Sequence, residues 1–436
     1  MGIQVRDQRY SEAERLAYLF CCCDWRSDEL IQGIRNPSPA FAKSLTSLIT
    51  FLCEAFPDRP KLDDLVAAIE SNESFQIASR KVTVRKRLRS VVIPHRSLVW
   101  LDWHLPEFRT HKILASHLGV APRQLDWLTF AGDSPERRPE HYVARWFRKR
   151  RRGFRLIESP KSCMKNVQRI ILQDVLSKPP VHPSAHGFCH RRSVLGFVKP
   201  HVNNEVCLRM DLKDFFPSVR GLRVQGLFRS LGYSSEIAKL LQRLTTCQTS
   251  HAVLAQRPGA TGRGATESSQ LYLPAHLPQG APTSPMLANL MAFGLDSRLT
   301  GLANSIGAVY TRYADDLLLS GDRSFGRMAK RLCTTIGAIA IEEGFQVNFR
   351  KTRIQYSSQR QHAAGIVINQ TTNIDRKVYD ELKAILFNCI RFGPASENRM
   401  QHPRFRDHLI GRIEWVRQLS AHRAAKLKTL FDRIQW

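Results

Sequence analysis

Two adjacent aspartates, Asp315 and Asp316, stand in the apolar and aromatic stretch YTRYADDLLLSG (310–321). Burying carboxylates beside leucines is costly unless a cation or hydrogen-bond donors compensate their charge. The flanking segments AVYTRY and LLLSG have the composition of two short strands, which places Ala314, Asp315 and Asp316 at the turn between them. Aspartate is also common in turns that have no catalytic role. The hairpin by itself therefore leaves both readings open.

A third aspartate, Asp211, ends another expected strand upstream. In VCLRMD (206–211), the apolar residues Val206, Leu208 and Met210 alternate with the other three, which is the period of a strand. Asp211 therefore emerges on the face opposite those apolar side chains. If this strand end lies beside the hairpin, three carboxylates gather at one edge of a sheet.

Such a carboxylate cluster would repel itself unless cations fill it. Oxygen ligands favour Mg²⁺, with Mn²⁺ as a possible substitute. Two such ions about 3.5–4 Å apart activate a hydroxyl and stabilise a leaving pyrophosphate in phosphoryl transfer. Because neighbouring strand residues point apart, Asp316 is expected to be the secondary ligand of the pair.

The charge balance indicates a polyanionic partner. The 66 Lys and Arg residues against 38 Asp and Glu residues give a formal net charge of +28, and nucleic acid is the usual partner for such an excess. The densest basic run, residues 148–152, is interleaved with Trp146, Phe147 and Phe154, which suits phosphate contact and base stacking. The alternatives are solubility by like charge and an ordinary solvated face.

The remaining elements are expected to form a helical frame around this chemistry. Residues 1–130 are predicted to be a helical N-terminal extension, with a capping box at Ser11 and Glu14. The Gly-, Ser- and Thr-rich segment 248–276 is predicted to be a surface insertion. Residues 376–436 show helical periodicity with basic opposite faces, and we expect a separate basic helical unit there.

The sequence shows no signal peptide and no apolar run long enough for a membrane span. None of the ten cysteines forms a Cys-x-x-Cys pair, and the triplet Cys21-Cys22-Cys23 is interpreted as free thiols. We therefore expect a protein of the reducing bacterial cytoplasm with no membrane partner.

Several blocks of sequence, taken in order over roughly residues 140–370, resemble the reverse transcriptases, and within them the bacterial retron-type enzymes. YADD (313–316) matches the family's Tyr-x-Asp-Asp motif. The other matching blocks are RLIESPKSCMKNVQRIIL (155–172), SAHGFCHRRSV (184–194), DLKDFFPSV (211–219), LPQGAPTSPMLANL (277–290), GFQVNFRKTRI (344–354) and HAAGIVIN (362–369).

The resemblance implies an RNA-directed DNA polymerase, a nucleotidyltransferase with the α+β right-hand polymerase fold. Fingers and a palm, the palm being an antiparallel sheet backed by helices, would occupy residues 131–375, and a helical RNA-binding thumb residues 376–436. Asp211, Asp315 and Asp316 would hold two Mg²⁺ ions together with the backbone carbonyl of Leu212. The residues implied to contact deoxynucleoside triphosphates are Phe216, Gln279, Gly280, Arg155, Lys161 and Lys351.

These nucleotide contacts differ in kind. Phe216 would block a ribose 2′-hydroxyl, with core packing beside Phe215 as the alternative. Gln279 and Gly280 would shape the nucleotide pocket. Arg155 and Lys161 would hold the triphosphate, and Lys351 would protonate the leaving pyrophosphate.

The retron resemblance also implies partners. The template and primer would be a dedicated structured noncoding RNA, partly copied into a short DNA joined to it, within an anti-phage defence system that includes a separate effector protein. Where retron enzymes usually carry Val-Thr-Gly, this chain has Ala363-Ala364-Gly365. The alternatives are a group II intron-like enzyme, another defence polymerase working without a fixed template, and an RNA-binding scaffold derived from a polymerase.

Overall fold

The computed structural model describes residues 39–57, 62–72, 103–130, 140–149, 153–259 and 269–436, with a few isolated positions before residue 62. The predicted capping box at Ser11 and Glu14, the cysteine triplet 21–23 and the basic residues 150–152 lie outside the described residues. In the described part of the chain, no helix combines the length and apolar character needed to cross a membrane.

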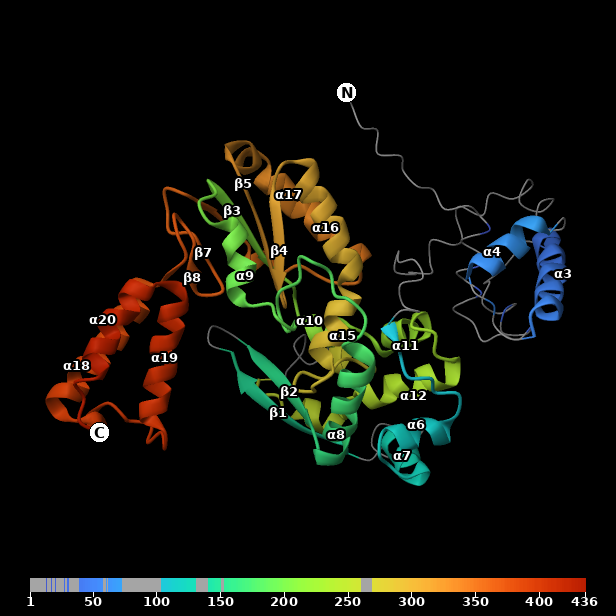
Figure 1. Cartoon of the computed structure of the whole chain (residues 1–436), viewed down its shortest axis with the longest axis horizontal. Helices are drawn as coiled ribbons and strands as arrows, with labels where there is room; N and C mark the ends of the chain where they lie inside the picture. Colours follow the sequence, from blue (N-terminus) through green and yellow to red (C-terminus); the bar gives the residue numbers. More distant parts are fainter. Residues whose placement is uncertain are drawn as a thin grey trace. The chain divides into compact units, whose positions relative to one another are not determined.

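The chain divides into two compact units, each built from separate stretches: residues 1–180 with 216–291, and residues 181–215 with 292–436. The helices and strands of the first unit are α3 (Pro39–Ala55), α4 (Leu62–Ser71), α6 (His111–His117), α7 (Pro122–Thr129), β1 (Tyr142–Arg148), β2 (Phe154–Pro160), α8 (Ser162–Ile171), the π-helical η5 (Leu172–Leu176), α11 (Gly221–Ser230), α12 (Ser235–Thr245), α13 (His251–Ala255) and α15 (Ser284–Met291) (Figure 1).

The second unit contains the larger sheet and the C-terminal helices. Its elements are α9 (Val194–Val198), η6 (Lys199–His201), β3 (Val206–Asp211), α16 (Phe293–Ser305), β4 (Val309–Tyr313), β5 (Asp316–Gly321), α17 (Arg323–Glu342), η7 (Phe349–Lys351), β6 (Arg353–Tyr356), β7 (His362–Ala363), β8 (Ile366–Val367), β9 (Asn373–Ile374), α18 (Arg376–Phe392), η8 (Pro394–Ser396), α19 (Phe405–Leu419) and α20 (Ala421–Phe431), and α10 (Phe215–Ser218) spans the boundary between the units.

The larger sheet contains the three strands that were expected to carry the aspartates. Its strand order is β4-β5-β3-β6, and all three pairings are antiparallel. Figure 1 shows α9 on one side of these strands and α16 and α17 on the other. Val206 packs against α17, whereas Cys207 joins α9 in a buried cluster, so both faces of β3 are covered near its start. The sheet is therefore a rigid support that ends at Asp211.

The smaller sheet of the first unit is the antiparallel hairpin β1-β2. Trp146 on β1 donates its indole N–H to the carbonyl of Val253 at 3.0 Å and packs edge-on against Tyr272. Trp146 was expected to lie on a base-stacking surface, but the structure places it in a small apolar cluster instead. Its neighbour Phe147 points outward and is 52% exposed, since successive strand residues face opposite sides.

The segment 248–276 differs from the expected surface insertion at both ends. Near its start, Thr249 and Leu254 are buried, and at its end Tyr272 and His276 are buried. The backbone N–H of Thr249 donates to the carbonyl of Tyr272 at 3.0 Å, which closes the segment into a loop. Its Gly- and Ser-rich composition concealed these few anchoring residues.

The C-terminal helices α18, α19 and α20 share one apolar cluster with β7, β8 and α9. The basic helical unit that was expected to be separate thus has its core in common with the rest of the second unit. The turn between β7 and β8 has positive φ at both Ala364 (48°) and Gly365 (80°), which is the backbone of a tight two-residue hairpin. The Ala363-Ala364-Gly365 departure therefore still forms a turn.

Candidate active site

The YADD residues 313–316 form a tight turn between β4 and β5. Ala314 has a positive φ of 55°, a conformation that non-glycine residues rarely adopt. A Cβ atom on Gly187 would lie 2.6 Å from the backbone nitrogen of Ala314. Glycine is therefore required at position 187, because only a residue without a side chain lets the two backbones approach so closely.

The sheet register brings the three aspartates to one end. Asp211 is the last residue of β3 and pairs with Asp316, the first residue of β5. The N–H of Leu212 donates to the carbonyl of Asp315 at 2.8 Å, and the carbonyl of Asp211 accepts from Asn348 at 2.7 Å. The predicted convergence of the aspartates and Leu212 is therefore present, although Asp316 belongs to the strand and not to the turn.

Two basic side chains pair with two of these carboxylates. The Lys351 Nζ donates to both carboxylate oxygens of Asp211 at 2.8 Å. Arg209 donates to both oxygens of Asp316, with Nη2 at 2.9 and 3.0 Å. The sequence reasoning anticipated Lys351 near this site but missed Arg209. The signal for Arg209 is its spacing of two from Asp211, which puts both side chains on one face of β3.

Asp315 is the carboxylate whose charge is least favoured. Burial, followed by the charges of Asp211 and Asp316, raises the pKa of Asp315 to about 6. A divalent cation would reverse this effect, so the donor set suits an oxygen-liganded ion such as Mg²⁺. Among the described residues, only Glu158, Cys247 and His276 bring one ligand atom each within 4.8 Å of the other two. The carboxylate oxygens of the three aspartates are not gathered that closely.

A buried ion pair, which the sequence did not predict, holds the YADD turn in place. Arg312 and Asp296 are fully buried and make two hydrogen bonds, at 2.8 and 2.7 Å. The Arg312 Nη1 also donates to the carbonyl of Ala314 at 3.0 Å, and the Tyr310 hydroxyl donates to Asp296 at 2.8 Å. This network connects α16 to the YADD turn.

His201 joins η6 to both strands of the hairpin. The Thr311 hydroxyl donates to the carbonyl of Phe197 at 2.8 Å, so its oxygen accepts from Nε2 of His201, also at 2.8 Å. Nδ1 of His201 then accepts from the Ser320 hydroxyl at 2.7 Å. Burial lowers the pKa of His201 to about 3, so this imidazole is neutral and its tautomer is set by its partners.

The expected nucleotide-pocket motif lies in the first unit and is tied to β2. The carbonyl of Gln279 accepts from the N–H of Glu158 at 3.0 Å. Gly280 has φ of 140°, and a Cβ there would lie 2.9 Å from the carbonyl oxygen of Glu158. The hydroxyl of Ser284 donates to the carbonyl of Pro278 at 2.7 Å and closes the motif on itself.

Three other expected nucleotide contacts also lie in the first unit, whereas Lys351 lies in the second. Arg155 is exposed on β2, and Lys161 is exposed at the start of α8, where its N–H donates to the carbonyl of His141 at 2.8 Å. Phe216 is half-buried in α10. Its neighbour Phe215 is 4% exposed and packs on Phe345 at a ring distance of 5.6 Å. Phe215 therefore packs in the core, and both roles considered for Phe216 stay predictions.

Comparisons with known proteins agree with this geometry. The family model described as reverse transcriptase (RNA-dependent DNA polymerase) matches residues 147–375. The retron Mx65 reverse transcriptase of Myxococcus xanthus is 36% identical over 82% of this chain and 79% of its own length. The retron Mx162 enzyme of the same organism is 35% identical over 70% of this chain and 64% of its own length.

Two further matches are more distant. The retron Ec86 reverse transcriptase of Escherichia coli is 31% identical over 64% of this chain and 77% of its own length. A solved structure of apo telomerase from Candida tropicalis matches 99% of this chain and 85% of its own with a TM-score of 0.38 and 11% identity, a likeness too low to carry an argument.

The chain belongs to the reverse transcriptase family, and its relatives place it among the retron-type enzymes. It is an RNA-directed DNA polymerase with the right-hand polymerase fold. The resemblance stated from the sequence motifs, the fold class and the enzyme class are thus confirmed.

Proposed function

We propose that this polymerase copies part of a dedicated structured noncoding RNA into a short DNA and that Asp211, Asp315 and Asp316 hold its two Mg²⁺ ions. The convergence of the three aspartates at one end of the sheet carries this assignment. The retron relatives support the choice of template. By the same resemblance, the enzyme would act in the bacterial cytoplasm in anti-phage defence, together with a separate effector protein.

When bound, the metal ions would activate the primer hydroxyl and stabilise the leaving pyrophosphate. Asp315 is the ligand whose charge a bound metal ion would stabilise most, because burial and two neighbouring carboxylates disfavour that charge. Asp316 is held by Arg209 and would be the secondary ligand. The carbonyl of Leu212 would complete the set.

Lys351 has a second task in this proposal. Its ammonium group pairs with the oxygens of Asp211 that metal coordination needs. With Asp211 serving as a metal ligand, Lys351, whose side chain is 55% exposed, would donate a proton to the leaving pyrophosphate. A lysine that neutralises the ligand before the metal arrives keeps the site from repelling itself.

The nucleotide would be recognised by residues of the first unit. Gln279 and Gly280 present backbone that is fixed by Glu158. Arg155 and Lys161 would contact the triphosphate, since both are exposed and basic. Phe216 would exclude ribonucleotides, and its half-buried position one residue after the core residue Phe215 suits a side chain held firmly at a pocket wall.

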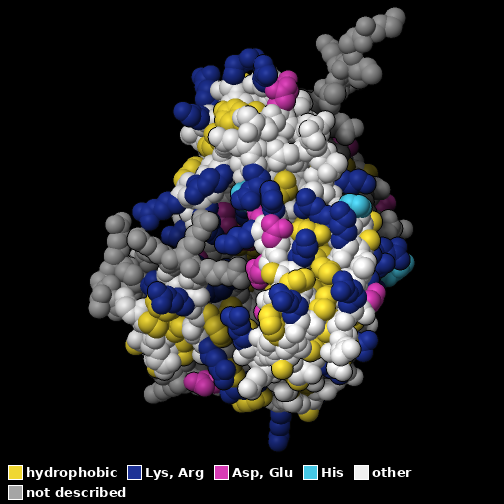
Figure 2. Space-filling view, turned by 90° about the vertical axis from the view of Figure 1, so that its left-hand side faces the viewer, with side chains coloured by type: hydrophobic (Ala, Val, Ile, Leu, Met, Phe, Trp, Pro, Cys, Tyr) yellow, Lys and Arg dark blue, Asp and Glu magenta, His cyan; other side chains and the backbone are white. Residues whose placement is uncertain are grey.

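The C-terminal helices offer a surface for RNA. The face shown in Figure 2 carries many more Lys and Arg than Asp and Glu side chains, with apolar side chains between them. Arg391 lies over the rings of Phe387 and Phe392, which are 49% and 67% exposed. Such exposed rings paired with arginine suit stacking of unpaired bases.

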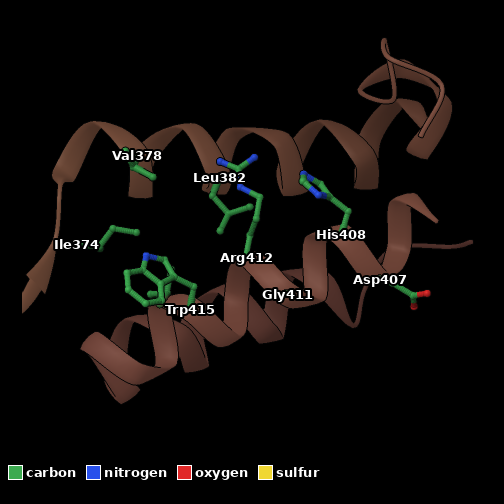
Figure 3. A pocket seen from close by; sticks show the side chains of 9 residues that line it. Ile374, Val378, Leu382, Asp407, His408, Gly411, Arg412 and Trp415 are labelled. Carbon is green, nitrogen blue, oxygen red and sulfur yellow. The ribbon is translucent and has the colours of Figure 1, made fainter. Parts of the chain in front are cut away.

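A pocket between α18 and α19 adds to this surface. Figure 3 shows Val378 and Leu382 of α18 facing Arg412 and Trp415 of α19 across it, with His408 near one end. An aromatic ring and a guanidinium beside an apolar floor match the chemistry of a nucleobase. We propose that these helices form the thumb that holds the template RNA.

The active-site assignment is tested with Asp315→Asn. We expect Mg²⁺-dependent DNA synthesis to be lost while RNA binding stays nearly intact, because the change removes a ligand charge and leaves the shape. Primer extension and filter binding measure the two. Glu107→Gln, which alters a carboxylate of the first unit that is 76% exposed, is the control. Synthesis by Asp315→Asn at the wild-type rate would remove Asp315 from the site.

The template proposal needs its own experiment. Nucleic acid that co-purifies with the wild-type chain and with Asp315→Asn would be sequenced. We expect one structured RNA with both proteins and DNA joined to it only with the wild type. A broad mixture of cellular RNAs would reject the dedicated template and leave the polymerase assignment standing.

A further inference from the structure

Outside the carboxylate site, Glu158, Cys247 and His276 form a buried cluster with three potential metal ligands. One atom from each residue lies within 4.8 Å of the other two. Nε2 of His276 is 2.9 Å from the Glu158 Oε2 and 3.4 Å from the Cys247 Sγ. All three residues are buried, and neither Cys247 nor His276 has a part in the polymerase mechanism proposed above.

The arrangement of lone pairs requires a proton or a metal ion at the centre of this cluster. Nδ1 of His276 lies 2.8 Å from the carbonyl of Pro274 and must carry its proton toward that oxygen. Nε2 of a neutral imidazole would then turn a lone pair toward the carboxylate of Glu158 and the sulfur of Cys247. Three such atoms repel one another unless a proton or a metal ion lies between them.

The distances are close to those of a tetrahedral zinc site. Zinc bonds of about 2.3 Å to sulfur and 2.0 Å to nitrogen and oxygen place S and N about 3.5 Å apart and N and O about 3.3 Å apart. The structure has 3.4 Å between S and N and 2.9 Å between N and O. A shift of a few tenths of an ångström brings these two distances to the zinc values, and the third, between the Cys247 sulfur and the Glu158 oxygen, is within 4.8 Å.

The surroundings of the cluster also match a structural metal site. A zinc-bound histidine normally donates its second ring N–H to a carbonyl or carboxylate, as His276 does to Pro274. The second oxygen of Glu158 accepts from the Thr249 hydroxyl at 2.6 Å, so the carboxylate is itself oriented. Complete burial would favour a closed site over a catalytic one.

The net charge of the cluster is the same whether a proton or Zn²⁺ lies between the three ligands. Without metal, a second proton on the His276 ring would balance the ionised Glu158 beside the neutral thiol of Cys247, and the three groups would sum to zero. Zn²⁺ displaces the proton on Nε2 of His276 and the thiol proton of Cys247, and Zn²⁺ with two anionic ligands and a neutral imidazole again sums to zero. Exchange therefore releases two protons and leaves no uncompensated charge in the interior.

We propose that Glu158, Cys247 and His276 bind a structural Zn²⁺ ion distinct from the catalytic Mg²⁺ ions. The ion would connect β2, the segment after α12 and the segment just before Gln279. Glu158 already holds Gln279 through its backbone N–H. The side chain of Glu158 contacts His276, and its backbone N–H binds Gln279, three residues further along the chain. Glu158 would thus hold the start of the nucleotide-pocket motif at both residues.

Metal content tests the proposal without any polymerase assay. The full chain, expressed with zinc and dialysed against a weak chelator, would be measured by plasma mass spectrometry, and we expect about one zinc per chain. Cys247→Ala and His276→Gln should each lose the zinc, whereas Cys207→Ala, at a buried cysteine outside the cluster, and Asp315→Asn should keep it. Circular dichroism confirms that each protein is folded.

Cobalt replacement provides a second readout that does not depend on variants that fail to fold. Wild-type protein loaded with Co²⁺ should show thiolate-to-cobalt charge-transfer absorption, retained in Cys207→Ala. Folded wild-type protein that contains no zinc and shows no such band would overturn the proposal. Zinc retained in full by both Cys247→Ala and His276→Gln would overturn it as well.

Discussion

At the scale of single residues, Gly187 controls how the YADD turn is held. Alanine at this position would place its Cβ 2.6 Å from the backbone nitrogen of Ala314, and backbone cannot move aside as a flexible side chain can. We expect Gly187→Ala to lower the rate of DNA synthesis by about 100-fold, the usual effect of a 1 Å displacement near reacting groups. Steady-state primer extension measures it.

Gly301→Ala is the matched control for this change. Gly301 lies in α16 of the same unit, and a Cβ there meets nothing within 4 Å. The control should keep the wild-type rate and gain slightly in melting temperature, because alanine favours helix. Equal rates for both variants would show that the turn tolerates displacement.

Phe216 is expected to select the sugar. Phe216→Ala should raise ribonucleotide incorporation relative to deoxynucleotide by about 10-fold or more, since a pocket wall of this kind discriminates by about 1–3 kcal/mol. Competitive incorporation assays give the ratio. Phe215→Ala, by contrast, should mainly lower the melting temperature, because Phe215 packs on Phe345 and lies under the Arg312 guanidinium. An unchanged ratio in Phe216→Ala would mean that this ring only packs.

At the scale of elements, His201 makes the attachment of η6 to β4 and β5 sensitive to acid. The pKa of His201 is lowered to about 3 in the folded chain, against about 6.5 in the unfolded chain. Between these values the unfolded state binds a proton that the folded state does not, so the free energy of unfolding falls as pH drops below about 6.5.

The size of this effect can be measured with urea. Between pH 7.5 and 5, the wild type should lose about 2 kcal/mol more than His201→Gln, whose starting stability is lower but whose side chain does not titrate. Urea midpoints at several pH values give both curves. Parallel curves for the two proteins would show that His201 is already protonated or accessible in the folded state.

The strands around the aspartates could be predicted because their signals are local. The alternation in 206–211 and the paired apolar runs around YADD define β3, β4 and β5 within a few residues of sequence. The tight turn at Ala364 and Gly365 and the anchored ends of 248–276 carry no comparable local signal. The composition of these segments indicates only that most of their residues are exposed, whereas a few buried residues determine how the segments are held.

The pairs that stabilise the site could not be read from the sequence for a different reason. Asp296 and Arg312 are joined by packing of α16 on β4, and the partners Glu158 and His276 lie on separate segments more than a hundred residues apart. No periodicity connects such positions. Arg209 and Lys351 belong to the same class, because each finds its carboxylate only once the sheet has formed.

At the scale of the whole molecule, charge should dominate the affinity for RNA. A net charge of +28 makes counterion release the main source of binding free energy, so log K should fall linearly with log salt concentration. With six or more phosphate contacts, affinity should drop about 1,000-fold between 50 and 200 mM salt. Fluorescence anisotropy with a labelled RNA measures this slope, and a flat response would contradict the proposed basic surface.

The chain passes between the two compact units inside or beside its motifs. One crossing, at 215/216, falls within DLKDFFPSV, and another, at 291/292, follows directly after LPQGAPTSPMLANL. The motif that supplies Asp211 to one unit therefore supplies Phe216 to the other. Of the matching blocks, DLKDFFPSV alone has residues in both units.

The buried pair of Asp296 and Arg312 limits how this enzyme can change over generations. Replacing either partner alone would leave a charge stranded in the interior, at a cost of about 3–5 kcal/mol, whereas exchanging both for a well-packed apolar pair can be neutral. A lineage must therefore cross an unfit single-mutant intermediate to lose the pair. Variation at positions 296 and 312 should thus be correlated across descendants of this chain, even where the surrounding surface has drifted freely.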